Sequence, residues 1–475
     1  MGPFGVRSGR RAVVVASAIV MALSVAACSS SSPKSSPSTS STASAVAVAP
    51  SSSAPTAATA ASSAASSEAP ATAAATSAAA ATGSTLNIGV IYPFTGSNAD
   101  QGAVGMAGCL TGVAQVNAAG GVLNHKLACK PFDTKGDPAD AVPAANQMLA
   151  SSSPVMVIGA SDDAVATSPI ITAAKIPNFA TIGDPHFDNQ TNPYFYRLTP
   201  SDALQGVALG YYAAKNNFTK AAAVFTSDLG AQTSVPPFRT EYKKLGGTLV
   251  SDLTLAPGST SYRSEVAKVI ASHPDAVISE MDPQSAATFW SEYLQLAGKL
   301  PVVLGTERTS EGDWITAVDK AVGDKVFDPA FTSIAPYVEF SGPGYDLYKQ
   351  YLGSLGSQIR DSSQYTGHPY AISDFDAVTI TALAMTMAKS TKGSDYNADI
   401  PKITAQTAGA TVVHTYAEGL TALASGKTIQ YVGASGPLVF DQYQSAGRAF
   451  AFFLYDAPTK SMLPKTVIPG TALAP

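Results

Sequence analysis

The feature that most constrains the fold is a repeated alternation of short apolar segments with longer helix-like segments. Leu86–Tyr92 is a short apolar run that ends at a Pro/Gly turn, and a helical pattern then covers 103–118. The alternation continues with predicted strands over 126–132, 155–158 and 177–181 and predicted helices over 138–150 and 164–174. This pattern at short spacing predicts an α/β fold in which helices cover parallel sheets.

A second series of the same kind starts after Pro200. It predicts helices over 203–215, 235–245, 262–271 and 285–297 and strands over 221–226, 248–253, 276–279 and 301–304. Two successive α/β units of similar size suggest two lobes. Because ligands of open α/β sheets bind beyond the carboxyl ends of the strands, we expect a solute to lie between the lobes.

The last third of the chain is less regular. It predicts strands over 326–333, 437–440 and 449–455 and helices over 345–355 and 375–389. We expect this section to return and complete the two lobes, because it lacks the regular alternation of a third domain.

The first residues have the pattern of an export signal. Three arginines precede an apolar run over 12–27, so residues 1–27 are predicted to be a signal peptide. Val25–Cys28 resembles the bacterial lipobox, in which the cysteine receives a lipid after cleavage. We therefore predict a lipid on Cys28 that holds the protein at the outer face of the cell membrane. The alternative is ordinary secretion with a spare cysteine.

The segment after Cys28 is almost entirely Ser, Ala, Thr and Pro. Such a composition buries too little apolar surface to offset the entropy of ordering the chain. We predict that residues 28–84 consist of the lipidated cysteine and a disordered stalk.

Charge and cysteine content limit the partners of the body. Only 13% of the residues are charged, the formal net charge is −5, and no Lys/Arg run stands out, so we expect no nucleic acid partner. No apolar stretch beyond residue 28 is expected to reach membrane-spanning length. Cys109 and Cys129 form an even pair, which predicts a disulfide in an exported protein, with two buried free thiols as the alternative. The scattered histidines predict no metal site.

Sequence motifs do not support an enzyme. The chain has no Gly-x-Ser-x-Gly, His-Glu-x-x-His or Gly-x-Gly-x-x-Gly motif in a fitting context. Gly426–Thr428 is like part of a phosphate-binding loop, but Thr421 stands where the first glycine belongs. We therefore expect no catalysis and no cofactor.

Several segments in order resemble a known family. The chain is similar to type I periplasmic binding proteins, specifically the leucine/isoleucine/valine-binding group of ABC transporters. The matching segments span nearly all of 86–456 and include 88–96, 117–122, 133–139, 157–159, 200–206, 304–307, 375–377 and 435–441.

The resemblance implies a two-lobed α/β fold with three crossing strands at the hinge. One lobe would hold 85–201 plus 333–440, and the other 202–332 plus 441–475. The lobes would close around one small solute by hinge motion. The family further implies a monomer that delivers an amino acid or related solute to an ABC permease. The alternative is a lipoprotein that passes its closed state to a receptor or sensor kinase.

The resemblance also implies two positions for the ligand ammonium group, Asp202 and Glu307. Carboxylates suit this role because they form charge-assisted hydrogen bonds with a cation. The alternative for Asp202 is the N-cap of the helix that starts at Ala203.

Other expected ligand-binding positions depart from the family pattern. Acidic residues stand at several wall positions, including the loop in which the amino-acid binders hold the ligand carboxylate. Asp162 and Asp163 of that loop either face the solute or turn away from it, with one of them capping the following helix. The predicted set, in addition to Asp202 and Glu307, is Gln101, Asp162, Asp163, Gly183, Asp184, Asp282 and Phe375. This wall is more acidic than a leucine pocket, so we expect a polar or cationic solute.

Overall fold

The computed structural model describes residues 81–468, except 97, 160–162, 329, 339, 447–448 and 457–460. All of them belong to one compact unit, Ala74–Pro475. The predicted signal peptide, Cys28 and nearly all of the predicted stalk lie outside the described residues, as does Asp162.

The first sheet has five parallel strands in the order β2-β1-β3-β4-β5. Helices connect the strands, because consecutive parallel strands need a crossover. The elements in chain order are β1 (Leu86–Tyr92), α1 (Ala99–Ala118), β2 (Leu127–Asp133), α2 (Pro138–Ser152), β3 (Met156–Gly159), α3 (Ala164–Ala173), β4 (Asn178–Ala180), η1 (Pro185–Phe187) and β5 (Phe195–Arg197).

Side chains of β1 alternate between two buried faces of this sheet. Ile88 and Val90 face a core shared with α1, whereas Ile91 packs with Met148 of α2 on the other face. The nearly continuous apolar run of β1 follows from this arrangement, since both faces of a parallel sheet are covered.

The second sheet has seven strands in the order β14-β13-β10-β9-β8-β6-β7. Five strands are parallel, and β13 and β14 add an antiparallel edge. The first part comprises α4 (Asp202–Lys215), β6 (Lys220–Thr226), α5 (Leu229–Thr233), α6 (Val235–Lys244), β7 (Thr248–Leu255), α7 (Arg263–Ala271), β8 (Ala276–Glu280), α8 (Pro283–Ala297), β9 (Val303–Gly305), η2 (Glu307–Ser310), α9 (Gly312–Val322), α10 (Asp324–Phe327) and β10 (Phe331–Pro336).

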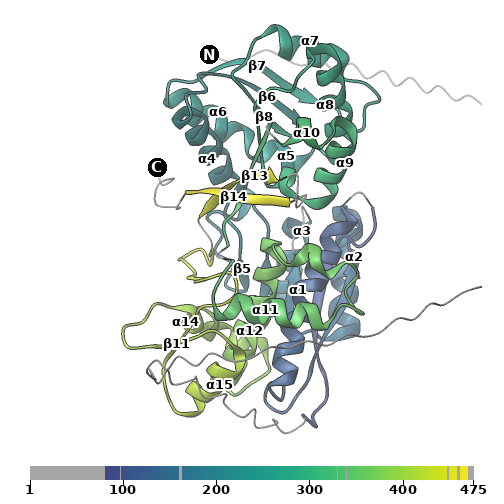
Figure 1. The fold of residues 1–475 in the computed structure, drawn as a ribbon. Helices are drawn as coiled ribbons and strands as arrows, with labels where there is room; N and C mark the ends of the chain where they lie inside the picture. Colours follow the sequence, from purple (N-terminus) through teal and green to yellow (C-terminus); the bar gives the residue numbers. More distant parts are fainter. Residues whose placement is uncertain are drawn as a thin grey trace, which may run out of the picture. The chain divides into compact units, whose positions relative to one another are not determined.

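Helices cover both faces of the second sheet as well (Figure 1). Ala222 and Val224 of β6 face the core under α7, α8 and α9, whereas Ala223 and Phe225 face α4 and α6. Each sheet thus has its own two cores.

The last section of the chain divides between the two sheets, as predicted. Its helices pack with α1 on the first sheet, while β13 and β14 join the second. These elements are α11 (Pro343–Ser354), η3 (Ser362–Tyr365), α12 (Pro369–Ala388), α13 (Gly393–Tyr396), η4 (Asn397–Asp399), α14 (Ile400–Thr404), β11 (Thr411–Val413), α15 (Tyr416–Ala424), β12 (Ile429–Tyr431), β13 (Phe450–Asp456) and β14 (Ser461–Ile468).

Two predicted strands were wrong. The segment 326–333 starts as the end of helix α10, and only its last residues enter β10. The segment 437–440 is irregular, because the preceding turn is held by a different device: backbone N–H groups of Ala434 and Ser435 donate to the buried Asp376 carboxylate at 2.9 and 2.7 Å.

Helix α12 is long and apolar enough to cross a membrane by length and composition, contrary to the sequence-based expectation. In the structure, 83% of the most apolar 18-residue stretch of this helix is buried inside the protein. Its contacts with α1 and α15 make it the central helix of the first core.

The predicted disulfide is confirmed. Cys109 of α1 and Cys129 of β2 are bonded, with their Cα atoms 6.2 Å apart. The bond joins a helix to the edge strand of the first sheet.

Candidate functional site

A cavity of about 690 Å³ lies at the carboxyl ends of strands from both sheets. The first sheet contributes Tyr92 at the end of β1 and 181–184 after β4. The second sheet contributes Glu280 at the end of β8 and Glu307 after β9. The cavity therefore occupies the place where open α/β sheets bind ligands, and its volume suits a small molecule.

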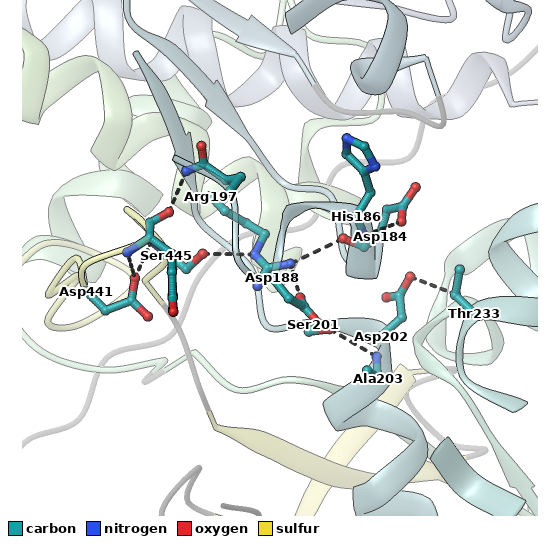
Figure 2. Close-up of polar contacts among 12 residues, drawn as sticks. Asp184, His186, Asp188, Arg197, Ser201, Asp202, Ala203, Thr233, Asp441 and Ser445 are labelled. Atoms are coloured by element: carbon teal, nitrogen blue, oxygen red, sulfur yellow. Dashed lines mark hydrogen bonds and ion pairs between the residues drawn. The ribbon is translucent and has the colours of Figure 1, made fainter. Parts of the chain in front are cut away.

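Asp202 is the first residue of α4 and borders this cavity. Its Oδ2 accepts a hydrogen bond from the Thr233 hydroxyl at 2.9 Å, and Figure 2 shows the carboxylate pointing toward that residue. Ser201, not Asp202, caps the helix, because its Oγ accepts from the Ala203 N–H at 3.1 Å. The capping alternative for Asp202 was wrong.

An ion pair between the buried Arg197 and the half-buried Asp188 supports the start of α4. Arg197 Nη1 lies 2.8 Å from the Asp188 carboxylate, whose other oxygen accepts from the Ser201 hydroxyl at 2.9 Å (Figure 2). Arg197 Nε also donates to Ser445 Oγ at 3.2 Å. This chain of contacts fixes the residue before Asp202 and ties it to the returning segment.

Gly183 allows Asp202 to approach the loop after β4. The Asp202 N–H donates to the Gly183 carbonyl at 2.8 Å, and a Cβ on Gly183 would overlap Asp202 Oδ1. Any side chain at position 183 would therefore displace the carboxylate.

Glu307 lies directly after β9, where Gln205 of α4 contacts it twice. The Glu307 N–H donates to Gln205 Oε1 at 2.9 Å, and Gln205 Nε2 donates to the Glu307 carboxylate. Gln205 and Asp202 are three residues apart, so they share one face of α4. The two predicted ammonium-binding residues are thus brought to the same wall.

Glu280 is a third acidic group on this wall. The β8–β9 register pairs Ser279 with Gly305, which places Glu280 beside the start of η2. Burial raises the pKa of Glu280 to about 8, and the carboxylates of Asp228 and Asp202 add to this shift. Burial, together with Asp202 and Glu280, also raises the pKa of Glu307 well above its usual range.

The positive charge at the cavity is already surrounded by carboxylates. Arg308 contacts Asp100 at 3.4 Å, Asp313 at 2.8 Å and Glu311. Oxygens of these three acids lie within 4.8 Å of one another, a spacing that could hold a metal ion, but the guanidinium supplies the positive charge among them. Burial and the nearby Arg308 lower the pKa of His368, another lining residue, to about 4, so its imidazole is neutral at pH 7.

The structure brings six of the predicted binding residues to the cavity: Gln101, Gly183, Asp184, Asp202, Asp282 and Glu307. Asp163 is instead 1% exposed at the N-cap position of α3, where its side chain forms no capping hydrogen bond. Phe375 is fully buried in α12 and packs edge-on against Tyr348, with ring centroids 5.3 Å apart. Its aromatic ring belongs to the core, which corrects its expected place at the solute.

Sequence reasoning missed several lining residues. Glu280 ends a strand of the second sheet two residues before the predicted Asp282; the sequence showed it as part of an acidic stretch, but it was not among the predicted binding residues. Tyr370 and His368 lie at the start of α12, which begins six residues before its predicted start. No local pattern indicates that this helix end reaches the cavity.

Comparison with known proteins identifies the family. The family model described as periplasmic binding protein matches residues 85–407, more than half of the chain. The chain belongs to the periplasmic binding protein family. These proteins bind solutes and catalyse no reaction, which confirms the prediction that this member of the family is not an enzyme.

Curated relatives share part of their length with this periplasmic binding protein. An amino acid binding protein of Pseudomonas aeruginosa is 27% identical over 40% of this chain and 52% of its own length. The Leu/Ile/Val-binding protein homolog 3 of Brucella melitensis is 27% identical over 50% of this chain and 64% of its own length. The chain thus spans about half to two thirds of the relatives it matches.

A solved structure supports the fold over more of the chain. A branched-chain amino acid ABC transporter protein from Thermus thermophilus, with bound valine, superimposes with a TM-score of 0.65 at 14% identity. The match covers 82% of this chain and 97% of that one. The predicted two-lobed α/β fold is confirmed.

Proposed function

We propose that this protein captures an amino acid or a related small polar solute between its two lobes and delivers it to an ABC importer. Both curated relatives carry names of amino-acid binders, and the similar solved structure is that of an ABC transporter protein. The relatives support the class of the solute only in this broad form.

One observation carries the proposal. Asp202 and Glu307 are brought together through Gln205, which follows Asp202 on α4 and contacts Glu307 across a sequence separation of 102, at a cavity bordered by strand ends of both sheets. Carboxylates that converge on a cavity suit the ammonium group of an amino acid. A purely structural surface protein has no need of this arrangement.

We place one lobe at 85–201 plus 333–440 and the other at 202–332 plus 441–475. Strand β10 of the second sheet spans the boundary at 332/333 and continues to Pro336. The solute is held by loops of both lobes, so binding favours the closed form. Asp184 and Gln101 come from the first lobe, and Asp282 comes from the second.

A broad thermal-shift screen tests capture. The full chain, freed of bound solute by partial unfolding and refolding, is mixed with amino acids, amines, amides and small polyols. A solute that binds only the native form raises the melting temperature by mass action. If no compound shifts the transition of the folded protein, the capture proposal is overturned.

We also propose that the chain is anchored at the outer face of the membrane by a lipid on Cys28. The anchor keeps the binding lobes near a membrane-bound importer, while a flexible stalk of 56 residues would reach roughly 40 Å. Intact-mass analysis of the membrane fraction should give a mature protein that begins at a diacylglyceryl cysteine. A Cys28→Ser variant should be released from the membrane, and a variant that stays anchored would contradict the proposal.

A further inference from the structure

The wall of the cavity carries an excess of acidic groups over basic ones. Besides the acids that pair with Arg308, six carboxylates line it: Asp184, Asp202, Asp228, Glu280, Asp282 and Glu307. Asp184 follows a strand of the first sheet, whereas the other five lie on elements of the second sheet, so acids border the cavity from both sides and mostly from the second.

Three of these acids also cap helices. Asp184, Asp228 and Asp282 each accept hydrogen bonds from backbone N–H groups at the start of the next helix. Capping explains why these residues stand where they do, yet each still brings its charge to the cavity.

The other three have no capping role. Asp202 binds the Thr233 hydroxyl, Glu307 is held by Gln205, and Glu280 ends β8 beside them. Placing like charges together in a partly buried wall costs free energy, and in the solute-free protein Glu280 and Glu307 reduce this cost by holding their protons to higher pH. A bound cation would offset it directly.

The described lining residues offer a ligand carboxylate no cationic side chain of its own. The Arg308 guanidinium is shared among Asp100, Glu311 and Asp313, and the imidazole of His368 is neutral. Any ionised acid of the wall that lies close to a ligand carboxylate repels it. The wall thus discriminates against the carboxylate half of an amino acid while favouring its amine half.

We propose that the captured solute is an organic cation without a free carboxylate, such as a primary amine or an alkyl guanidine. This inference rests on the proposed solute capture and specifies its substrate class. The ammonium or guanidinium group lies against Asp202, Glu280 and Glu307, where it forms charge-assisted hydrogen bonds.

Matched pairs of compounds test this class. Each amino acid is compared with the amine left after removal of its carboxyl group: leucine with isopentylamine, lysine with cadaverine, and arginine with agmatine. Calorimetric titration of the full chain at pH 8.5 should give at least about tenfold tighter binding for the amine in the best-binding pair. Equal or tighter binding of the amino acid overturns the inference.

The outcomes separate this inference from the proposed function. Tight binding of an amino acid leaves solute capture intact and overturns only the substrate class. Failure of all six compounds, together with a thermal-shift screen in which nothing binds, overturns both.

A charge variant adds a second readout. Glu280→Gln should weaken amine binding at least about tenfold. It should also narrow the difference in affinity between the amine and the amino acid of each pair, because the lost charge both attracts the amine and repels the ligand carboxylate. Asp346→Asn removes an exposed carboxylate of α11, with 70% of its side chain exposed, and should change no affinity more than about twofold. An unchanged difference in Glu280→Gln contradicts the inference.

Discussion

The Gln205 side chain forms two hydrogen bonds with Glu307: its Oε1 accepts from the Glu307 N–H at 2.9 Å, and its Nε2 donates to the Glu307 carboxylate. The Gln205 side chain is 2% exposed and comes from α4, one turn after Asp202. One side chain therefore sets the relative position of the two acids that we place at the solute.

Replacing this link should weaken binding more than it weakens the fold. In Gln205→Leu the Glu307 carboxylate loses its donor and the Glu307 N–H loses its acceptor, so solute affinity should fall by about 1 to 3 kcal/mol. Calorimetric titration with the tightest compound of the thermal-shift screen measures the change. Gln147→Leu, at an exposed position of α2, serves as the control, and equal affinities in both variants would contradict the role of Gln205.

Gly183 offers a steric test of Asp202. A methyl group there would overlap Asp202 Oδ1, so Gly183→Ala should displace the carboxylate and lower solute affinity at least about tenfold. Gly353→Ala, at an exposed position of α11, meets no atom within 4 Å and should bind as the wild type does. Wild-type affinity in Gly183→Ala would show that the Asp202 carboxylate does not contact the solute.

The pKa of Glu280 predicts a pH dependence of stability. The unfolded chain loses this proton near the usual value of 4.5, whereas the folded protein keeps it to about 8. The folded state therefore binds more protons between these values, and stability falls as pH rises through this window. Thermal melts of solute-free protein from pH 5 to 8.5 should show a steeper decline in the wild type than in Glu280→Gln.

The pKa of Glu307 is raised in the same direction, so the Glu280→Gln variant should keep part of the decline in stability with pH. Parallel curves for the two proteins would mean that Glu280 titrates normally and would contradict the crowding of acids at this wall.

The disulfide gives a prediction independent of the site. Cys109 and Cys129 close a loop with a sequence separation of 20 residues, so replacing both with alanine should cost about 3 kcal/mol of unfolding free energy. Denaturant titration measures this loss, and solute affinity should stay within about threefold. A reduced wild type with unchanged stability would contradict the structural role of the bond.

Much of the fold could be predicted from the sequence because the parallel strands are buried on both faces. The run Leu86–Tyr92 and the helix after it have a local pattern that tertiary contacts only reinforce. The short strand β5, by contrast, has three residues and depends on pairing with β4, so no local period reveals it.

The irregular last section was harder for a physical reason. Helix α12 starts at Pro369, six residues before its predicted start, because proline suits the first turn of a helix. Tyr370 in its first turn lines the cavity, whereas the aromatic ring of Phe375 is buried in the core. Which face of a fully buried helix meets the solute depends on packing, and an apolar run carries no such information.

The site could be predicted only in part. Asp202 and Glu307 followed from matching segments of the family, whereas Glu280 and the Arg308 network depend on strand register and on contacts between distant segments. The acidic character of the wall was visible in the sequence. The pairing of Arg308 with three acids could not be seen in the sequence.

Calorimetric titration of the full-length wild type and of an Asp202→Asn/Glu307→Gln double variant, with the tightest compound of the screen, tests the central claim most directly. We predict one site in the wild type and an affinity at least about a hundredfold lower in the variant, because two of the carboxylates that contact the cation are neutralised. Unchanged affinity in a folded double variant would contradict capture of the solute by these two residues.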